Sequence, residues 1–277
     1  MTARRDWLSL LLRAAVWLAA GLTFSVFLSL VGYVLIRGVP NLAPELFSWK
    51  YTSDNGSMLP AIVSTALMTA ISLLAAVPLG VFAAIYLTEY AGRGNRLVKA
   101  VRLTSETLAG IPSIVYGLFG YLFFLVRLKW DYSLLAGAMT LAIMILPLIM
   151  RTTEEALLSV PDGFREGSYA LGAGRLRTIF RIALPTAVPG ILAGVILATG
   201  RIVGETAALL YTAGTYPQLP EGLFSSVRTL SVHMYVLSSE GLHVDKAYAT
   251  AAVLLVVVAG INALSSSLAK RIARGWG

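Results

Sequence analysis

The chain has 277 residues, of which 57% are hydrophobic and 13% are charged, and its mean hydropathy is +0.77. That leaves too little polar surface to cover a soluble globule of this length, so much of the chain must contact lipid. The net charge of +8 could indicate nucleic-acid binding, but the basic residues form short clusters between apolar runs and not one continuous face. Cysteine is absent, which excludes a disulfide framework, a thiolate metal site and a thiol nucleophile.

Six apolar runs are long enough to cross a bilayer, at about residues 14–36, 61–88, 107–126, 134–150, 187–213 and 247–268. We therefore predict an all-α polytopic membrane protein in which residues 1–277 form a single transmembrane domain. The first run follows Arg4, Arg5 and Arg13, as a secretory signal does, but it is too long for the apolar region of a signal. We expect it to be a retained helix.

The distribution of Lys and Arg predicts the orientation of these spans. One side collects 15 basic residues from the termini and alternate loops, and the other side has six. Because basic residues accumulate in cytoplasmic loops, we expect both termini, and residues near Arg96 and Arg175, to be cytoplasmic. Residues near Asp54 and Ser225 should then face outward. The remaining basic residue, Arg201, falls inside the fifth span.

A polar segment at about residues 151–186 connects the fourth and fifth spans on the cytoplasmic side. Its apolar residues recur at the spacing of short amphipathic helices, which are interrupted at Pro161, Asp162 and Gly163. Helices of this kind lie at the membrane surface or dock a partner. The outer loop at about residues 214–246, rich in Gly, Pro and Ser, is the longest on the opposite side.

Several kinds of functional site are not indicated by any motif. His233 and His243 are ten residues apart, with no carboxylate at zinc-ligand spacing, so we predict no metal site. The P-loop motif Gly-x-x-x-x-Gly-Lys-Ser/Thr does not occur, so any nucleotide chemistry must belong to another subunit. Gly-x-Ser-x-Gly, His-Glu-x-x-His and an intramembrane aspartate pair are also missing, which leaves an intramembrane enzyme as a weaker alternative.

One family resemblance is carried by Glu166-Gly167-Ser168-Tyr169-Ala170-Leu171-Gly172, followed after nine residues by Ile182-Ala183-Leu184-Pro185. The spacing resembles the EAA loop of ABC importer permeases, which reads Glu-Ala-Ala, three residues, Gly, nine residues, Ile-x-Leu-Pro. Gly167 and Ser168 replace the two alanines, and we expect a looser first turn because glycine is a poor helix former. In that family the loop is a coupling helix that seats in a groove of the ATPase.

The resemblance implies that ATPase coupling depends on Glu166, Tyr169, Leu171, Gly172 and Leu176. The three apolar side chains among them, Tyr169, Leu171 and Leu176, would anchor the helix in the groove. We expect this helix to end at Pro185 and, being joined to the fifth span, to transmit a push without bending much.

Three further stretches resemble the phosphate-specific subgroup of these permeases, its PstA-type subunits. They are Ile85-Tyr86-Leu87-Thr88-Glu89-Tyr90-Ala91, Glu106-Thr107-Leu108-Ala109-Gly110-Ile111-Pro112-Ser113-Ile114-Val115-Tyr116-Gly117-Leu118-Phe119-Gly120 and Gly200-Arg201-Ile202-Val203-Gly204-Glu205-Thr206-Ala207. This resemblance implies the type I ABC importer permease fold, and a subunit that moves inorganic phosphate into the cytoplasm by alternating access. The alternatives are a permease for phosphonate, sulfate or molybdate, and a membrane scaffold that transports nothing.

The same resemblance implies the partners of the chain and its location. The partners would be a related permease subunit that forms a heterodimer with it, two ATP-binding subunits, an extracytoplasmic phosphate-binding protein and membrane lipid. ATP and Mg would bind to the ATPase subunits, and this chain would hold no cofactor, catalyse no bond change and bind no nucleic acid. The location would be the cytoplasmic (inner) membrane of a bacterium or archaeon.

The fifth span combines small and charged residues on one face. At about 100° per residue, a single arc of about 140° holds Gly190, Gly194, Gly200, Arg201, Gly204 and Glu205. Gly-x-x-x-Gly spacing indicates close helix packing, and charge on the same stripe points to a substrate pathway formed by Gly200, Arg201, Gly204 and Glu205. Arg201 would meet the anion and Glu205, one turn on, would contact Arg201. The alternative is a buried ion pair that only fixes helix packing.

Overall fold

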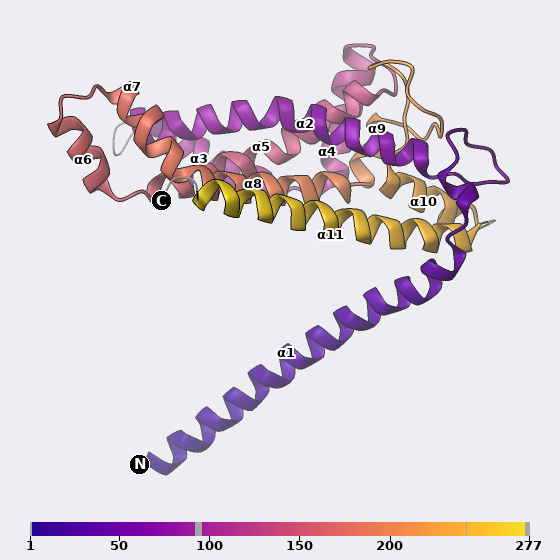
Figure 1. Cartoon of the computed structure of the whole chain (residues 1–277), viewed down its shortest axis with the longest axis horizontal. Helices are drawn as coiled ribbons and strands as arrows, with labels where there is room; N and C mark the ends of the chain where they lie inside the picture. Colours follow the sequence, from indigo (N-terminus) through magenta and orange to yellow (C-terminus); the bar gives the residue numbers. More distant parts are fainter. Residues whose placement is uncertain (1, 92–95, 242, 275–277) are drawn as a thin grey trace.

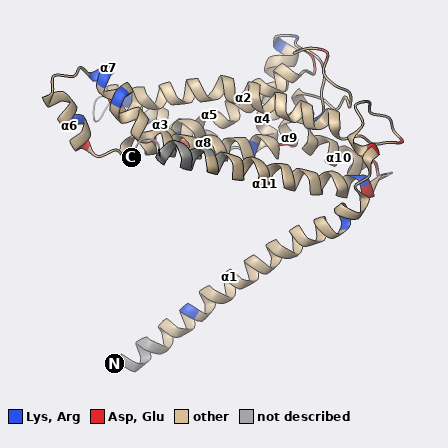
Figure 2. Cartoon of the chain, viewed as in Figure 1, with Lys and Arg blue, Asp and Glu red and all other residues tan. Residues whose placement is uncertain are grey.

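The computed structural model describes residues 2–91, 96–241 and 243–274, and within these ranges every regular element is a helix. Arg93, one of the basic residues used to orient the spans, lies outside the described residues. The long helices lie side by side in one bundle, except the first, which leaves it at an angle (Figure 1). Charged residues gather mainly at the two ends of the bundle (Figure 2). The predicted all-α architecture is confirmed.

The first helix, α1 (Thr2–Gly38), contacts the bundle only near its C-terminal end, where it meets α11 (Val244–Arg274) (Figure 1). The rings of Tyr33 and Tyr248 pack edge to face with centroids 5.8 Å apart, and Gly38 lies directly against the Tyr248 backbone. Two short 3₁₀ helices, η1 (Val39–Asn41) and η2 (Pro44–Phe47), then lead into the bundle. The side of α1 is therefore left uncovered by the described chain along most of its length.

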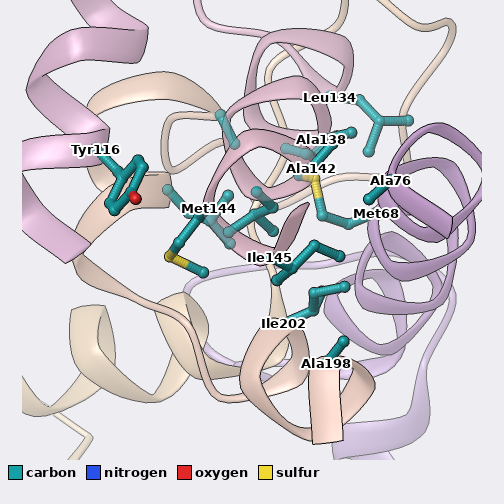
Figure 3. Close-up of a cluster of buried hydrophobic side chains, with 14 of the residues drawn as sticks. Met68, Ala76, Tyr116, Leu134, Ala138, Ala142, Met144, Ile145, Ala198 and Ile202 are labelled. Atoms are coloured by element: carbon teal, nitrogen blue, oxygen red, sulfur yellow. The ribbon is translucent and has the colours of Figure 1, made fainter. Parts of the chain in front are cut away.

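Three helices, α2 (Leu59–Ile85), α5 (Leu134–Leu158) and α8 (Leu184–Val203), pack together at the centre of the bundle. Glycines allow the close approach: a Cβ added to Gly80 would lie 2.8 Å from Ile149, and one added to Gly190 would lie 2.6 Å from Ala156. Apolar side chains fill the centre (Figure 3), among them Met68, Met144, Ile145, Ala198 and Ile202. Because lipid is as apolar as this core, close packing, more than removal from water, holds the helices together.

In the described part of the chain, five helices are long and apolar enough to cross a membrane. They are Trp7–Asn41, Leu59–Tyr90, Leu134–Leu158, Arg175–Val203 and Val244–Leu264. A sixth candidate span is a broken pair, α3 (Arg96–Ala109) and α4 (Ser113–Gly120), the latter continued by the π-helical η4 (Tyr121–Arg127). These two helices are bent by 103° at Gly110–Pro112. The continuous span predicted at 107–126 is therefore wrong, since proline disfavours helical backbone at the residue before it.

The fifth span also differs from its predicted range of 187–213. The helix begins at Arg175, through α7 (Arg175–Thr178) and the π-helical η5 (Ile179–Ala183), and it ends at Val203. After a break at residues 204–206, α9 (Ala207–Thr212) follows. Pro185 lies at the start of α8, which continues directly from η5, so it does not end a helix as predicted.

The two ends of the bundle are built differently. At one end, α2 closes with the π-helical η3 (Tyr86–Tyr90), and α6 (Asp162–Ala170) follows α5 as a separate short helix. The opposite end carries the loops at residues 48–58 and 213–229 and α10 (Leu230–Glu240), which packs on α11. We call these the α6 end and the α10 end.

Candidate functional site

A cavity of about 550 Å³ lies between α3, α5 and α8. Its lining extends along α5 from Leu158, beside the α6 end, to Met144 in the interior, a helical rise of roughly 21 Å. Three arginines and three glutamates line it: Arg102, Arg151, Arg201, Glu106, Glu154 and Glu155. Glu154 is buried and Arg201 half-buried, while the other four are exposed, so charge extends from an open mouth into the apolar bundle. Keeping charge at such interior positions is costly, which points to a route for a polar solute.

Two of the three arginines are neutralised by glutamates. Arg102 of α3 forms an ion pair with Glu154 of α5, and Arg151 Nε lies 3.0 Å from Glu155 Oε1 one turn along α5. Within the described part of the chain, Arg201 takes part in no ion pair. Arg201 is therefore the cation of this cavity that is free to meet an anion.

The position of Arg201 follows from the helix that carries it. Its neighbours on α8, Ala198 and Ile202, are buried in the central core, while the Arg201 side chain is half-buried and reaches the cavity. Arg201 lies two residues before the end of α8 at Val203. Unpaired carbonyls at a helix C-terminus favour a nearby cation, which offsets part of the cost of keeping arginine in the bundle.

Glu205 does not contact Arg201 as the helical spacing predicts, because α8 has already ended. Its Oε1 accepts a hydrogen bond of 3.1 Å from the backbone N–H of Ala208, at the start of α9. Its carbonyl accepts a hydrogen bond of 2.6 Å from the Ser231 hydroxyl of α10. The buried Glu205 thus caps α9 and joins it to α10.

Of the four residues predicted to line a pathway, the cavity includes only Arg201. Gly200 and Gly204 do not lie in tight contacts with another helix. A Cβ added to Gly200 would be 4.0 Å from the Asn262 side chain, and a Cβ added to Gly204 would be 3.6 Å from the Gly200 carbonyl oxygen of its own helix. The sequence alone does not bring the other charged lining residues together, because they come from different spans. Two features of the sequence could have indicated some of them. Arg151 and Glu155 are four residues apart, the spacing of an ion pair on one helix, and Glu106 lies just before the break in span three.

The predicted coupling residues lie at the α6 end, on or beside α6 and α7. Glu166 is exposed, and so are the apolar side chains of Tyr169, Leu171 and Leu176, with Leu171 reaching 90% exposure. Ser168 is buried instead, and its hydroxyl lies 2.8 Å from that of Thr178 on α7. One face of α6 is therefore held against the chain while apolar side chains project from the tip.

Gly172 follows the end of α6 in a left-handed conformation. Its φ is +80°, and the N–H groups of Gly172 and Ala173 donate to the carbonyls of Tyr169 and Ser168 at 2.9 Å and 3.1 Å. This pair of hydrogen bonds is the Schellman motif, which favours glycine at the left-handed position. The glycine of the EAA-like pattern therefore has a backbone role at the end of α6 and is not a helical residue.

Two titratable side chains, Arg228 and His233, are buried at the α10 end. Arg228 is 4% exposed, its guanidinium lies 4.7 Å from the Tyr51 ring, and its Nε and Nη2 have no hydrogen-bond partner among the described residues. His233 of α10, outside the candidate spans, is fully buried. Burial, and next the charge of Arg228, lower the pKa of His233 to about 3, although the Gly56 backbone acts in the opposite direction.

Comparisons with known proteins agree with this geometry. Residues 76–277 match the family described as "binding-protein-dependent transport system inner membrane component". The chain is 34% identical over 243 residues to the probable ABC transporter permease protein YqgI of Bacillus subtilis (strain 168), with 82% of each chain covered. It is 42% identical over 182 residues to the phosphate transport system permease protein PstA of Pasteurella multocida (strain Pm70), covering 65% of this chain and 64% of that protein.

Among solved structures, the chain is similar to one chain of a bacterial ABC transporter involved in the import of the acidic polysaccharide alginate. The TM-score is 0.68, the sequence identity is 21%, and 97% of each chain is covered. At this identity the likeness shows the fold alone. The type I ABC importer permease fold that the sequence implied is confirmed.

Proposed function

The chain belongs to the binding-protein-dependent transport system inner membrane components, and on that premise we propose that it conducts inorganic phosphate. It is a multi-pass inner membrane protein and the non-catalytic permease subunit of an ABC importer. ATP binds to separate subunits of such importers. The chain therefore contributes a path for the solute across the membrane and changes conformation in response to the ATPase. We infer the identity of the solute from the cavity and from the relatives.

The observation that carries the proposal is the unpaired guanidinium of Arg201, which lines the interior of a cavity that extends to the α6 end. An arginine inside the hydrocarbon layer costs about 2.5–3.5 kcal/mol on insertion scales, and an anion beside it offsets that cost. The guanidinium also presents paired N–H donors that match the oxygen spacing of phosphate. Arg102 and Arg151 already have carboxylate partners, so an anion in transit would meet Arg201 first.

Two features favour phosphate, and the second of them distinguishes it from sulfate and molybdate. The first is similarity to phosphate transport system permease proteins, at 42% identity for the Pasteurella protein. The second is Glu106, whose carboxylate lines the same cavity as Arg201. At neutral pH phosphate keeps a proton that it can donate to a carboxylate, whereas sulfate has none and would only be repelled. Phosphonate shares that proton and molybdate does not.

For the assembly, ABC importer permeases combine with ATPase subunits and a binding protein. We infer that this chain pairs with a related permease subunit in a heterodimer, and that two ATPase subunits dock at the α6 end. The exposed Tyr169, Leu171 and Leu176 support that docking, since large apolar side chains projecting from a polar tip suit a protein groove. The α6 end and both termini would then face the cytoplasm, and the α10 end would face the phosphate-binding protein.

Uptake of labelled phosphate tests the proposed solute. The genes for this chain and its partners are expressed in a host that lacks its own phosphate importers, and unlabelled anions are added as competitors. We expect uptake that excess phosphate abolishes and that sulfate, molybdate and phosphonate leave largely intact. Uptake that sulfate or molybdate suppresses as well as phosphate does would contradict the proposal.

The orientation is tested by labelling single cysteines, which is clean because the chain has no native cysteine. We expect a membrane-impermeant reagent applied to intact cells to label position 225 and not position 175. The reverse pattern would place the α6 end outside and contradict the inferred docking of the ATPase there.

A further inference from the structure

One buried arginine connects α6 to two other helices. Arg165 of α6 donates to Glu89 Oε1, at the end of α2, through Nε at 3.1 Å and Nη2 at 2.8 Å. The same guanidinium donates to the carbonyls of Leu157 at 2.9 Å and Val160 at 2.8 Å, at the end of α5 and just beyond it. A longer contact of 3.4 Å reaches the exposed carboxylate of Asp162.

These contacts use the whole hydrogen-bonding capacity of the guanidinium. Arginine has five N–H donors in a planar fork, and here they serve five contacts. The side chains of Arg165 and Glu89 are only 14% and 7% exposed, so the ion pair is shielded from water and salt. A lysine could keep the charge but could not span the same acceptors, because its three donors radiate from one atom.

The contacts of Arg165 connect α6 to the part of α5 that lines the cavity. Residues 144–158 of α5 form one wall of the cavity, and Glu154 lies one turn before Leu157, whose carbonyl Arg165 binds. A second link of α6 to the bundle runs through the Ser168 and Thr178 hydroxyls to the helix that continues as α8. Without Arg165, a displacement of α6 would reach α5 through the backbone of residues 159–161 and would otherwise pass along α7 and α8.

We propose that Arg165 is a positioning residue that makes α6 move as one body with the ends of α2 and α5, so that ATPase action on α6 reshapes the cavity wall on α5. This inference rests on the proposed function in placing the ATPase at α6. It does not depend on which solute the cavity carries. A buried, fully bonded ion pair suits the task, since separating its partners leaves an uncompensated charge.

The test uses the assembled complex with Arg165→Gln and Arg165→Lys, and Asp162→Asn as the matched control. Asp162→Asn removes only the charge of the long, exposed ion pair and leaves the bonds to Glu89, Leu157 and Val160 in place. In proteoliposomes we expect both Arg165 variants to hydrolyse ATP, with the phosphate moved per ATP reduced by about fivefold or more, a typical coupling factor between two sites. The control should keep the wild-type ratio.

A merely structural role would lower the yield of complex and leave the transport per ATP unchanged, so an unchanged ratio in Arg165→Gln overturns the proposal. Hydrogen exchange without solute provides a second readout. Adding ATP to the wild-type complex should change exchange at both α6 and residues 155–160, and in Arg165→Gln only at α6. If residues 155–160 still respond in the variant, the proposal is overturned. If the exchange results are as expected but no phosphate moves, the proposed solute fails and the role of Arg165 stands.

Discussion

Glu205 accepts a hydrogen bond of 3.1 Å from the backbone N–H of Ala208, and this places its carboxylate at the start of α9. The helical spacing of four residues had predicted that Glu205 would contact Arg201, but α8 ends at Val203 between them. Glu205 therefore fixes the α8–α9 break, and Arg201 lines the cavity without an ion pair in the described residues. The two charges have separable roles that mutation can distinguish.

Arg201→Gln should assemble with its partners and lose phosphate uptake, because the free cation of the cavity is removed. Glu205→Gln should keep most uptake, since the amide oxygen can still accept from the Ala208 N–H. The double neutral variant should fail like Arg201→Gln alone. Uptake and complex yield are measured for all three variants. Recovery of uptake in the double variant would mean that the pair serves only helix packing.

Glu106→Gln should weaken discrimination between phosphate and sulfate. The carboxylate that accepts the phosphate proton and repels sulfate is replaced by an amide, which can donate to either anion. The loss of one such hydrogen bond corresponds to about 1–3 kcal/mol, or roughly fivefold to somewhat over a hundredfold in the ratio of inhibition constants. The matched control is Glu45→Gln, an exposed carboxylate in η2 outside the cavity. Equal sulfate inhibition in both variants would exclude this role for Glu106.

Gly172→Ala should weaken binding of the ATPase, because a φ of +80° costs an L-residue about 1–2 kcal/mol and the turn after α6 would shift. The neighbouring Leu171 would be displaced with it. Gly174→Ala is the control, since Gly174 has an ordinary φ of −72° and open space around it. Co-purification of the ATPase with each variant measures the effect. Equal recovery in Gly172→Ala and Gly174→Ala would contradict the role of this turn in docking.

The buried His233 should make the protein less stable in acid. Its pKa is lowered to about 3 in the folded chain, so between pH 6.5 and 3 the unfolded chain binds a proton that the folded chain does not. Stability from this group is complete above pH 6.5 and falls by about 1.4 kcal/mol for each pH unit below it. The melting temperature in detergent measures the trend, which should be shallower in His233→Phe than in the control His243→Gln. Parallel curves for the two variants would show that His233 does not contribute.

Long apolar runs predict the spans well, because their length is set by the bilayer and does not depend on the neighbours of each helix. The breaks within the third and fifth spans are harder to predict. Pro112 predicts a kink, but the 103° bend also depends on Gly110 and on how α4 packs against α9. The end of α8 at Val203 has no proline to mark it. Glu205 stabilises the break through Ala208, three residues on, and through Ser231 of α10, a distant contact that the local sequence does not show.

For the cavity too, features within one helix can be predicted from the sequence, and pairings between helices cannot. Arg201 could be found from one helix, because an arginine among glycines in an apolar run is conspicuous. That Arg201 is the unpaired arginine of the cavity could not be predicted. It depends on the ion pair between Arg102 of α3 and Glu154 of α5, which only the arrangement of the helices in space reveals. The same holds for Arg165 and Glu89, which are 76 residues apart in sequence.

The most direct test of the central claim is the ATPase activity of the purified complex in lipid, with its binding protein, as phosphate is raised at constant ATP. We predict that phosphate stimulates hydrolysis in the wild type, that the same concentrations of sulfate do not, and that Arg201→Gln removes the stimulation while the basal rate persists. Equal stimulation by sulfate, or full phosphate stimulation and uptake with Arg201→Gln, would contradict the account of a phosphate permease in which Arg201 meets the anion.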